Sequence, residues 1–180
     1  MDRWRRLGDT AAIAISVLML TGCASMRVNS YLERGTDLTR YRTYNWAADD
    51  RLSTGDPRLD NNSFFRERLQ ADVEKQLTTR GFEKITAETP DVWLRYHARI
   101  NQQVDVNGAD RKYGGCDDCM PSVYDAGTLM LDFIDARTNR LVWRGWAEGS
   151  LDGAIDNQGW MEQRIDEAVM RILAKLPGRL

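Results

Sequence analysis

A regular alternation of apolar and polar residues predicts a β-strand in the middle of the chain. Between residues 92 and 100 the even positions are apolar, and the odd positions hold Trp93, Arg95, His97 and Arg99. Successive side chains of a strand point to opposite faces of a sheet. This strand is therefore expected to have one core face and one face that is cationic and aromatic.

Two further strands are expected at residues 128–134 and 141–148, joined by a tight turn. Asn139 lies in this turn and tolerates the positive φ that closes it. The register that keeps the apolar residues on one face places Asp132 opposite Arg144, so opposite charges meet across the strands. The other expected pairs are Phe133 with Trp143, Leu131 with Gly145, Leu129 with Ala147, Met130 with Trp146 and Ile134 with Val142.

Two amphipathic helices are predicted from apolar residues that recur on one helical face. The first covers residues 60–80, with Asn61, Asn62 or Ser63 as its cap and Gly81 at the left-handed position after its last turn. Its apolar positions are Phe65, Leu69, Val73 and Leu77. The last helix begins after Asp156 or Asn157, ends before Pro177, and presents Met161, Ile165, Ala168, Val169, Ile172 and Leu176.

These elements together predict an α+β fold for residues 31–180, as a single domain. Both helices are expected on the apolar face of a mostly antiparallel or mixed sheet. Residues 101–127 lack periodicity and contain Asn107-Gly108 and Gly114-Gly115, so we expect a long loop there.

The first residues of the chain have the pattern of an export signal. Three arginines at positions 3, 5 and 6 precede an apolar run over residues 11–20, which is too short to span a bilayer. The run ends in Leu20-Thr21-Gly22 directly before Cys23, which resembles the bacterial lipobox. The resemblance implies removal of residues 1–22 as a lipoprotein signal peptide and covalent lipid on Cys23. The alternative is a plain cleaved signal, or a short membrane segment with an accidental cysteine.

Lipidation at Cys23 would anchor the protein to a membrane. In the lipoproteins that this segment resembles, aspartate after the cysteine favours the inner membrane, so Ala24 indicates the outer membrane with the domain in the periplasm. Residues 23–30 are expected to form the lipidated N-terminus and a short tether, with the lead into a first strand as the alternative for residues 24–30. No cofactor other than the covalent lipid is expected.

Composition excludes a nucleic-acid partner. Without residues 1–22 the chain has 158 residues, with 22 Lys and Arg against 25 Asp and Glu, and no basic block. The full sequence has six tryptophans, five of them after Cys23, and six tyrosines, which argue against disorder.

Two segments resemble a known family. Residues 37–46, in which Tyr44 and Trp46 alternate with polar residues as in a strand, resemble the opening "D-F-x-x-Y-K-T-F-x-W" of the bacterial lipoprotein family called domain of unknown function 4136 (DUF4136). Residues 134–147 match its "I-D-x-x-T-x-x-L-V-W-R-G-W-A", with Asn139 in place of the usual glycine. The resemblance covers nearly all of residues 26–178. It implies an α+β domain with two helices on one face of the sheet and carries no assigned activity.

The leftover face of the sheet is the first candidate binding site. Arg144 and Trp146 on the hairpin would join the odd positions of the central strand, and interfaces favour Trp, Tyr, Met and Arg. The candidate residues are Trp93, Arg95, His97, Arg99, Arg144 and Trp146. The alternative is that the 101–127 loop or the N-terminal segment covers this face.

The second candidate is the pair Cys116 and Cys119, the cysteines that remain beside a lipidated Cys23. In an oxidising compartment a disulfide is the simplest expectation. A redox dithiol would need a lowered thiol pKa, and a zinc site would need four ligands, whereas His97 is the one histidine of the sequence. Metal or redox chemistry at this pair stays open as an alternative function.

Enzyme motifs are missing from the sequence. Asp132, Asp135 and Glu148 could form an acid/base set for a hydrolase. However, an ion pair with Arg144 accounts for the presence of Asp132, and a structural role in the turn accounts for Asp135. We expect a non-catalytic binding, accessory or structural protein of the bacterial envelope, with membrane contact through its lipid and an envelope protein as partner.

Overall fold

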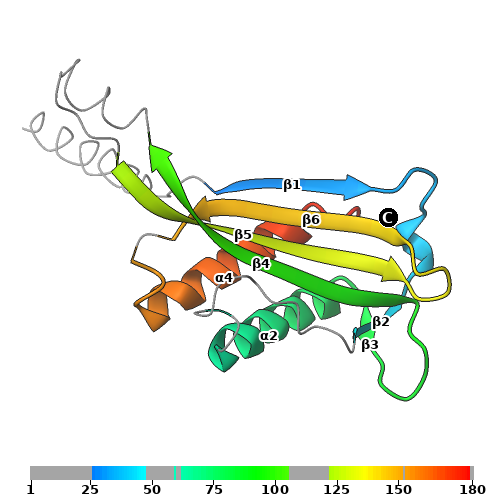
Figure 1. Ribbon diagram of the computed structural model, residues 1–180. Helices are drawn as coiled ribbons and strands as arrows, with labels where there is room; N and C mark the ends of the chain where they lie inside the picture. Colours follow the sequence, from blue (N-terminus) through cyan, green and yellow to red (C-terminus); the bar gives the residue numbers. More distant parts are fainter. Residues whose placement is uncertain (1–25, 48–58, 60–61, 106–121, 152, 179–180) are drawn as a thin grey trace, which may run out of the picture.

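The computed structural model describes residues 26–47, 59, 62–105, 122–151 and 153–178, and these form an α+β domain (Figure 1). In chain order the elements are β1 (Arg27–Leu32), η1 (Leu38–Arg40), β2 (Thr43–Trp46), α2 (Ser63–Thr79), β3 (Glu83–Lys84), β4 (Val92–Asp105), β5 (Ser122–Asp135), β6 (Leu141–Ser150) and α4 (Gln158–Leu173).

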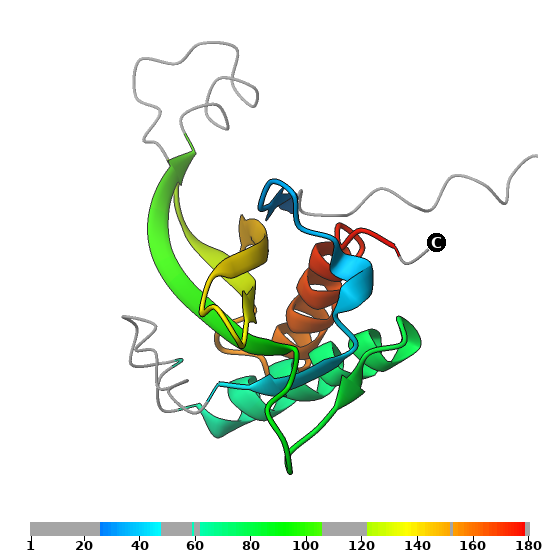
Figure 2. The same ribbon diagram turned by 90° about the vertical axis from the view of Figure 1, so that its right-hand side faces the viewer.

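The six strands form one mixed sheet with the order β1-β6-β5-β4-β2-β3. Neighbours from β1 to β4 are antiparallel, whereas β2 runs parallel to both β4 and β3. The sheet is curved, and α2 and α4 both lie on its concave side (Figure 2). The predicted fold class is therefore confirmed.

Both predicted helices are present and begin at asparagine caps. Asn62 accepts a hydrogen bond from the Phe65 amide at 3.0 Å, and Asn157 accepts one from the Trp160 amide at 3.1 Å. After α2 the amide of Phe82 donates to the carbonyl of Leu77, and Gly81 has a φ of 74°, as the predicted helix ending requires. Helix α4 ends at Leu173, but Leu176 still lies in the core.

The β5–β6 hairpin has the predicted register except beside its turn. Asp132 lies opposite Arg144 and Phe133 opposite Trp143, but Ile134 pairs with Leu141 because the register shifts between Phe133 and Ile134. The expected pair of Ile134 with Val142 is therefore wrong. An irregularity of this kind puts an extra residue in one strand, and the turn itself has Asn139 at the predicted positive φ, 53°.

The core fills the space between the sheet and the two helices. Trp143 and Phe133 are fully buried and meet edge to face, with ring centroids 5.1 Å apart. All the predicted apolar positions of α2 and α4 are buried. One residue of α2 was not expected inside: Asp72, which pairs with Arg68 at 3.0 Å.

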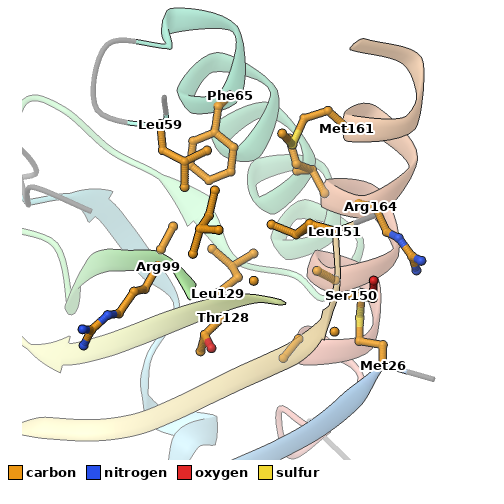
Figure 3. A pocket seen from close by; sticks show the side chains of 17 residues that line it. Met26, Leu59, Phe65, Arg99, Thr128, Leu129, Ser150, Leu151, Met161 and Arg164 are labelled. Carbon is orange, nitrogen blue, oxygen red and sulfur yellow. The ribbon is translucent and has the colours of Figure 1, made fainter. Parts of the chain in front are cut away.

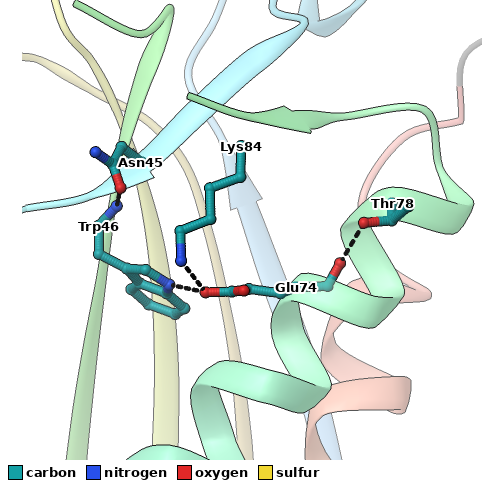
Figure 4. A network of polar contacts seen from close by, with 5 residues as sticks. All are labelled: Asn45, Trp46, Glu74, Thr78 and Lys84. Atoms are coloured by element: carbon teal, nitrogen blue, oxygen red, sulfur yellow. Dashed lines mark hydrogen bonds and ion pairs between the residues drawn. The ribbon is translucent and has the colours of Figure 1, made fainter. Parts of the chain in front are cut away.

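Glu74 ties α2 to the far edge of the sheet (Figure 4). Its carboxylate accepts hydrogen bonds from the indole nitrogen of Trp46 at 2.8 Å and from the ammonium of Lys84 at 2.6 Å. Strands β2 and β3 are thus held to the helix by polar contacts in addition to apolar packing.

Two boundaries differ from the predicted ones. Of the two expectations for residues 27–30, a tether or the lead into a first strand, the structure shows the strand, because β1 begins at Arg27 and pairs with β6 through its backbone. Residues 101–105 and 122–127 are not loop, because β4 and β5 continue as paired strands to Asp105 and Ser122. In both segments backbone pairing forms the strand without the apolar alternation that a buried strand needs.

Several predictions lie outside the described residues. These are the signal peptide, Cys23 with its lipid, and the pair Cys116 and Cys119. Within the described ranges, no helix is both long and apolar enough to cross a membrane.

Candidate functional site

The convex face of the sheet, which we call the outer face, carries all six candidate residues. Trp93, Arg95, His97 and Arg99 come from β4, and Arg144 and Trp146 come from β6, with β5 between them. None of the helices and strands that the structure describes lies over this face (Figures 1 and 2). Arg99 is exposed and the other five side chains are half-buried.

A buried carboxylate organises the centre of the outer face. Asp132 on β5 lies between Arg95 on β4 and Arg144 on β6. Both oxygens of Asp132 accept hydrogen bonds from the Arg144 guanidinium at 2.6 Å. The Nε2 atom of His97 lies 3.5 Å from the same carboxylate. The predicted pairing of Asp132 with Arg144 is therefore confirmed, in the bidentate geometry that favours arginine.

The neighbouring row across the sheet is amphipathic. His97 lies opposite Met130, Met130 opposite Trp146, and Trp146 opposite Asn29 of β1. Residues directly opposite on one face of an antiparallel pair are in contact range. An aromatic ring, a thioether and an imidazole thus form one continuous strip, which strand β1 extends.

Positive charge is in excess on the outer face. On β1, β6, β5 and β4 the described side chains of this face include four arginines, Arg27, Arg95, Arg99 and Arg144, and two carboxylates, Asp132 and Glu148. The Asp132 hydrogen bond raises the pKa of Arg144, so this guanidinium stays charged at any physiological pH.

One nitrogen of Arg95, the Nε atom, is buried and has no hydrogen-bond partner in the described part of the chain. Arg95 lies opposite Asp132, but the hydrogen bonds to both oxygens of that carboxylate come from Arg144. A buried donor without a partner carries a cost in free energy that a bound acceptor would remove.

Asp135 has a structural role in the turn beside the outer face. Its Oδ1 atom accepts from the amides of Arg137 and Thr138, at 3.0 and 2.7 Å, and its Oδ2 atom accepts from the hydroxyl of Tyr41 at 2.9 Å. The expected role of Asp135 in the turn is confirmed. Across the described part of the chain, His, Cys, Asp and Glu form no group able to hold a metal ion.

The structure also contains an apolar pocket that the sequence analysis missed (Figure 3). It lies between the concave face of the sheet and the first turns of α2 and α4, and has a cavity volume of about 60 Å³. Its walls are Leu59, Phe65, Leu129, Leu151, Met161 and Ile165, and Met26 lies at its edge. We refer to this cavity as the apolar pocket.

Small residues create the apolar pocket. Three strands and α4 turn Ala98, Gly127, Ala147, Gly149 and Ala168 toward it. Elsewhere the same strands place large side chains such as Leu94, Phe133 and Trp143 against the helices. The change from large to small residues along β4, β5 and β6 is the sequence signal that could have revealed a cavity.

A sequence model of the family described as "Domain of unknown function (DUF4136)" matches residues 28–178. Among curated proteins, none matches this chain.

Solved structures that match this chain have little sequence identity to it. A DUF4136 family protein from Bacteroides thetaiotaomicron has a TM-score of 0.56 and 12% identity, over 84% of this chain and 96% of that chain. A PDZ domain protein from Parabacteroides distasonis has a TM-score of 0.54 and 14% identity over 87% of this chain, which spans only 37% of that protein. A PelC dodecamer from Paraburkholderia phytofirmans has a TM-score of 0.45 and 10% identity, over 86% and 100% of the two chains.

Proposed function

The chain belongs to the DUF4136 family, whose shared domain has no known function, and from this membership we propose that it is a non-catalytic binding protein of the bacterial envelope. A lipid on Cys23 anchors it to the outer membrane, and its domain faces the periplasm. The outer face of the sheet binds an envelope protein that presents acidic groups.

The observation that carries this proposal is the composition of the outer face. Trp93, Trp146, Met130 and three arginines lie side by side on strands that no described element covers. Such residues are enriched at the centres of protein interfaces and contribute most of their binding energy. A solvated face of a sheet needs none of them.

The charge of the outer face indicates the partner's chemistry. On β1, β6, β5 and β4 the described side chains of the outer face include four arginines and two carboxylates, and Glu83 at the β3 edge adds a third carboxylate, so positive charge stays in excess. A carboxylate-rich segment supplies the opposite charge, in a geometry that suits guanidinium groups.

In-cell photo-crosslinking tests the proposed interface. A photoreactive residue replaces Trp93 or Trp146, and the matched control replaces Trp160, which lies on α4 and is 54% exposed. We expect one abundant envelope protein to be captured from positions 93 and 146 and not from position 160. Equal capture from all three positions, or crosslinks only within the chain, would contradict the proposal.

The anchor has an independent test. Replacing Cys23 by serine removes the sulfur that carries the lipid, so the protein should leave the membrane fraction and lose incorporation of labelled palmitate. Membrane association that survives Cys23→Ser would rule out the lipid anchor.

Metal or redox chemistry at Cys116 and Cys119 is the alternative function. In the proposed binding role the pair has no part in partner recognition. Replacing both cysteines by serine should then leave the crosslinking yield from positions 93 and 146 unchanged under oxidising and reducing conditions. A yield that depends on these cysteines would favour the alternative.

A further inference from the structure

We propose that the apolar pocket holds the end of one acyl chain of the lipid on Cys23. The inference rests on the lipid anchor of the proposed function. It adds a second site on the concave side of the sheet, away from the outer face.

The chemistry of the pocket selects a hydrocarbon. Apart from Thr128, Ser150 and two arginines, its lining residues have aliphatic, aromatic or thioether side chains or are glycines. The two arginines at its edge, Arg99 and Arg164, direct their guanidinium groups away from the cavity (Figure 3). The guanidinium of Arg164 also forms an ion pair with the carboxylate of Glu167, with a nitrogen–oxygen distance of 3.2 Å. A ligand with a polar group would find few partners inside, whereas methylene groups would lose their contact with water.

The position of the pocket indicates which hydrocarbon this is. Met26 lines its edge and lies three residues after Cys23. Three residues span at most about 10 Å, less than the length of a long acyl chain. An attached chain is also present at a high effective concentration, in the millimolar range for a short flexible link. A small site can therefore be filled by the attached lipid although it would bind free lipid weakly.

The size of the pocket limits the occupant to part of one chain. A cavity volume of about 60 Å³ accommodates a short hydrocarbon segment and not a whole lipid. The methionines at positions 26 and 161 can adapt to its shape, because their unbranched side chains are flexible. The remaining chains of the lipid stay free to insert into the membrane.

Photo-crosslinking with a labelled fatty acid tests the inference. Cells that produce the full chain are fed palmitate with a diazirine at its terminal carbon, irradiated, and the purified protein is digested for mass spectrometry. The mass of the Cys23 peptide first establishes whether Cys23 carries acyl chains. We expect this acylated peptide to be covalently joined to the peptides that contain Phe65 or Met161.

A matched pair of variants links the product to the cavity. Ala168→Leu fills the pocket from α4 and should reduce the yield of the crosslinked peptides at least about five-fold. Ala71→Leu, on the exposed surface of α2, should leave this yield unchanged. If Ala168→Leu does not accumulate, Gly149→Val takes its place. A Cβ at Gly149 meets Met26 at an ordinary 3.6 Å, so this side chain can enter the edge of the pocket.

Three outcomes would overturn the inference. An acylated Cys23 without links to the pocket peptides removes the pocket site but leaves the anchor intact. Pocket peptides joined to a fatty acid that is not attached to Cys23 identify a membrane phospholipid as the occupant. An unacylated Cys23 removes both the anchor and the inference.

Discussion

At Asp135 a single carboxylate organises the turn between β5 and β6. Burial acts to raise the pKa of this carboxyl, but the hydrogen bonds from Thr138, Tyr41 and Arg137 outweigh it and hold the pKa below its ordinary value. A lowered folded-state pKa gives stability that is fully present above the unfolded pKa of about 3.9. That stability is lost as the pH falls through the folded value.

Asp135→Asn should therefore change the acid sensitivity of the protein. We expect a loss of about 1–2 kcal/mol of unfolding free energy at pH 7, and a shallower decline of stability below about pH 4 than in the natural protein. Urea unfolding at a series of pH values between about 3 and 7 measures both effects. The control is Asp156→Asn at an exposed position. Parallel pH profiles for Asp135→Asn and the natural protein would refute the role of this carboxylate.

Gly145 is required for close packing of β6 against α4. A Cβ atom at this position would overlap with the ring of Trp143 and lie 2.6 Å from a methyl group of Ile172. Both neighbours are fully buried and cannot move away. Gly145→Ala is expected to destabilise the protein by about 1–3 kcal/mol, because a close-packed core resists an added methyl group.

Gly149→Ala is the matched control for Gly145→Ala. It lies on the same face of the same strand, but its Cβ finds only ordinary contacts with Met26. Thermal unfolding of the two variants should show a large drop in Tm for the first and little change for the second. Equal drops would point to the strand propensity of glycine and not to the packing of Trp143.

Between strands, the buried pair of Asp132 and Arg144 should couple β5 to β6. A double-mutant cycle with Asp132→Asn and Arg144→Met is expected to give a coupling energy of about 1–2 kcal/mol, reduced by the partial exposure of Arg144. The pair Arg27 and Glu148, 3.8 Å apart and largely exposed, joins β1 to β6 and serves as comparison. Its coupling should be near zero. Similar values for the two cycles would mean that burial of Asp132 adds nothing.

The elements that bury apolar side chains were predictable from the sequence. Alternation along residues 92–100 and the apolar stripes of the two helices specify their inward faces, and the buried residues agree with them. The alternation of side chains along β4 and β6 also placed Trp93 and Trp146 on the same face of the sheet. Local sequence determines which side of an element faces the core.

Features that depend on distant residues were not predictable. Strand β1 has little apolar periodicity and forms because β6, more than a hundred residues later, supplies its hydrogen-bond partners. The unpaired Nε of Arg95 and the apolar pocket depend on how separate strands and helices meet. Such contacts leave no trace in the spacing of neighbouring residues.

On the scale of the whole molecule, sheet and helices share one core. The cluster of buried apolar residues includes members of β2, β4, β5, β6, α2 and α4. Neither layer can keep its apolar face buried without the other. We therefore expect cooperative unfolding. The tryptophan fluorescence, which is dominated by the burial of Trp143, should change at the same denaturant concentration as the helical circular dichroism signal. A fluorescence midpoint clearly below the dichroism midpoint would show that the sheet opens before the helices melt.

The place of β1 in the sheet has a mechanical consequence. It is the strand next to Cys23, it lies at an edge, and β6 is its one neighbour in the sheet. With a lipid at Cys23, any force that pulls the domain away from the membrane enters through β1. Tension along the strand loads its hydrogen bonds to β6 together, whereas tension across the sheet breaks them one after another. The angle at which a partner pulls would then decide how much load the protein withstands before its first strand detaches.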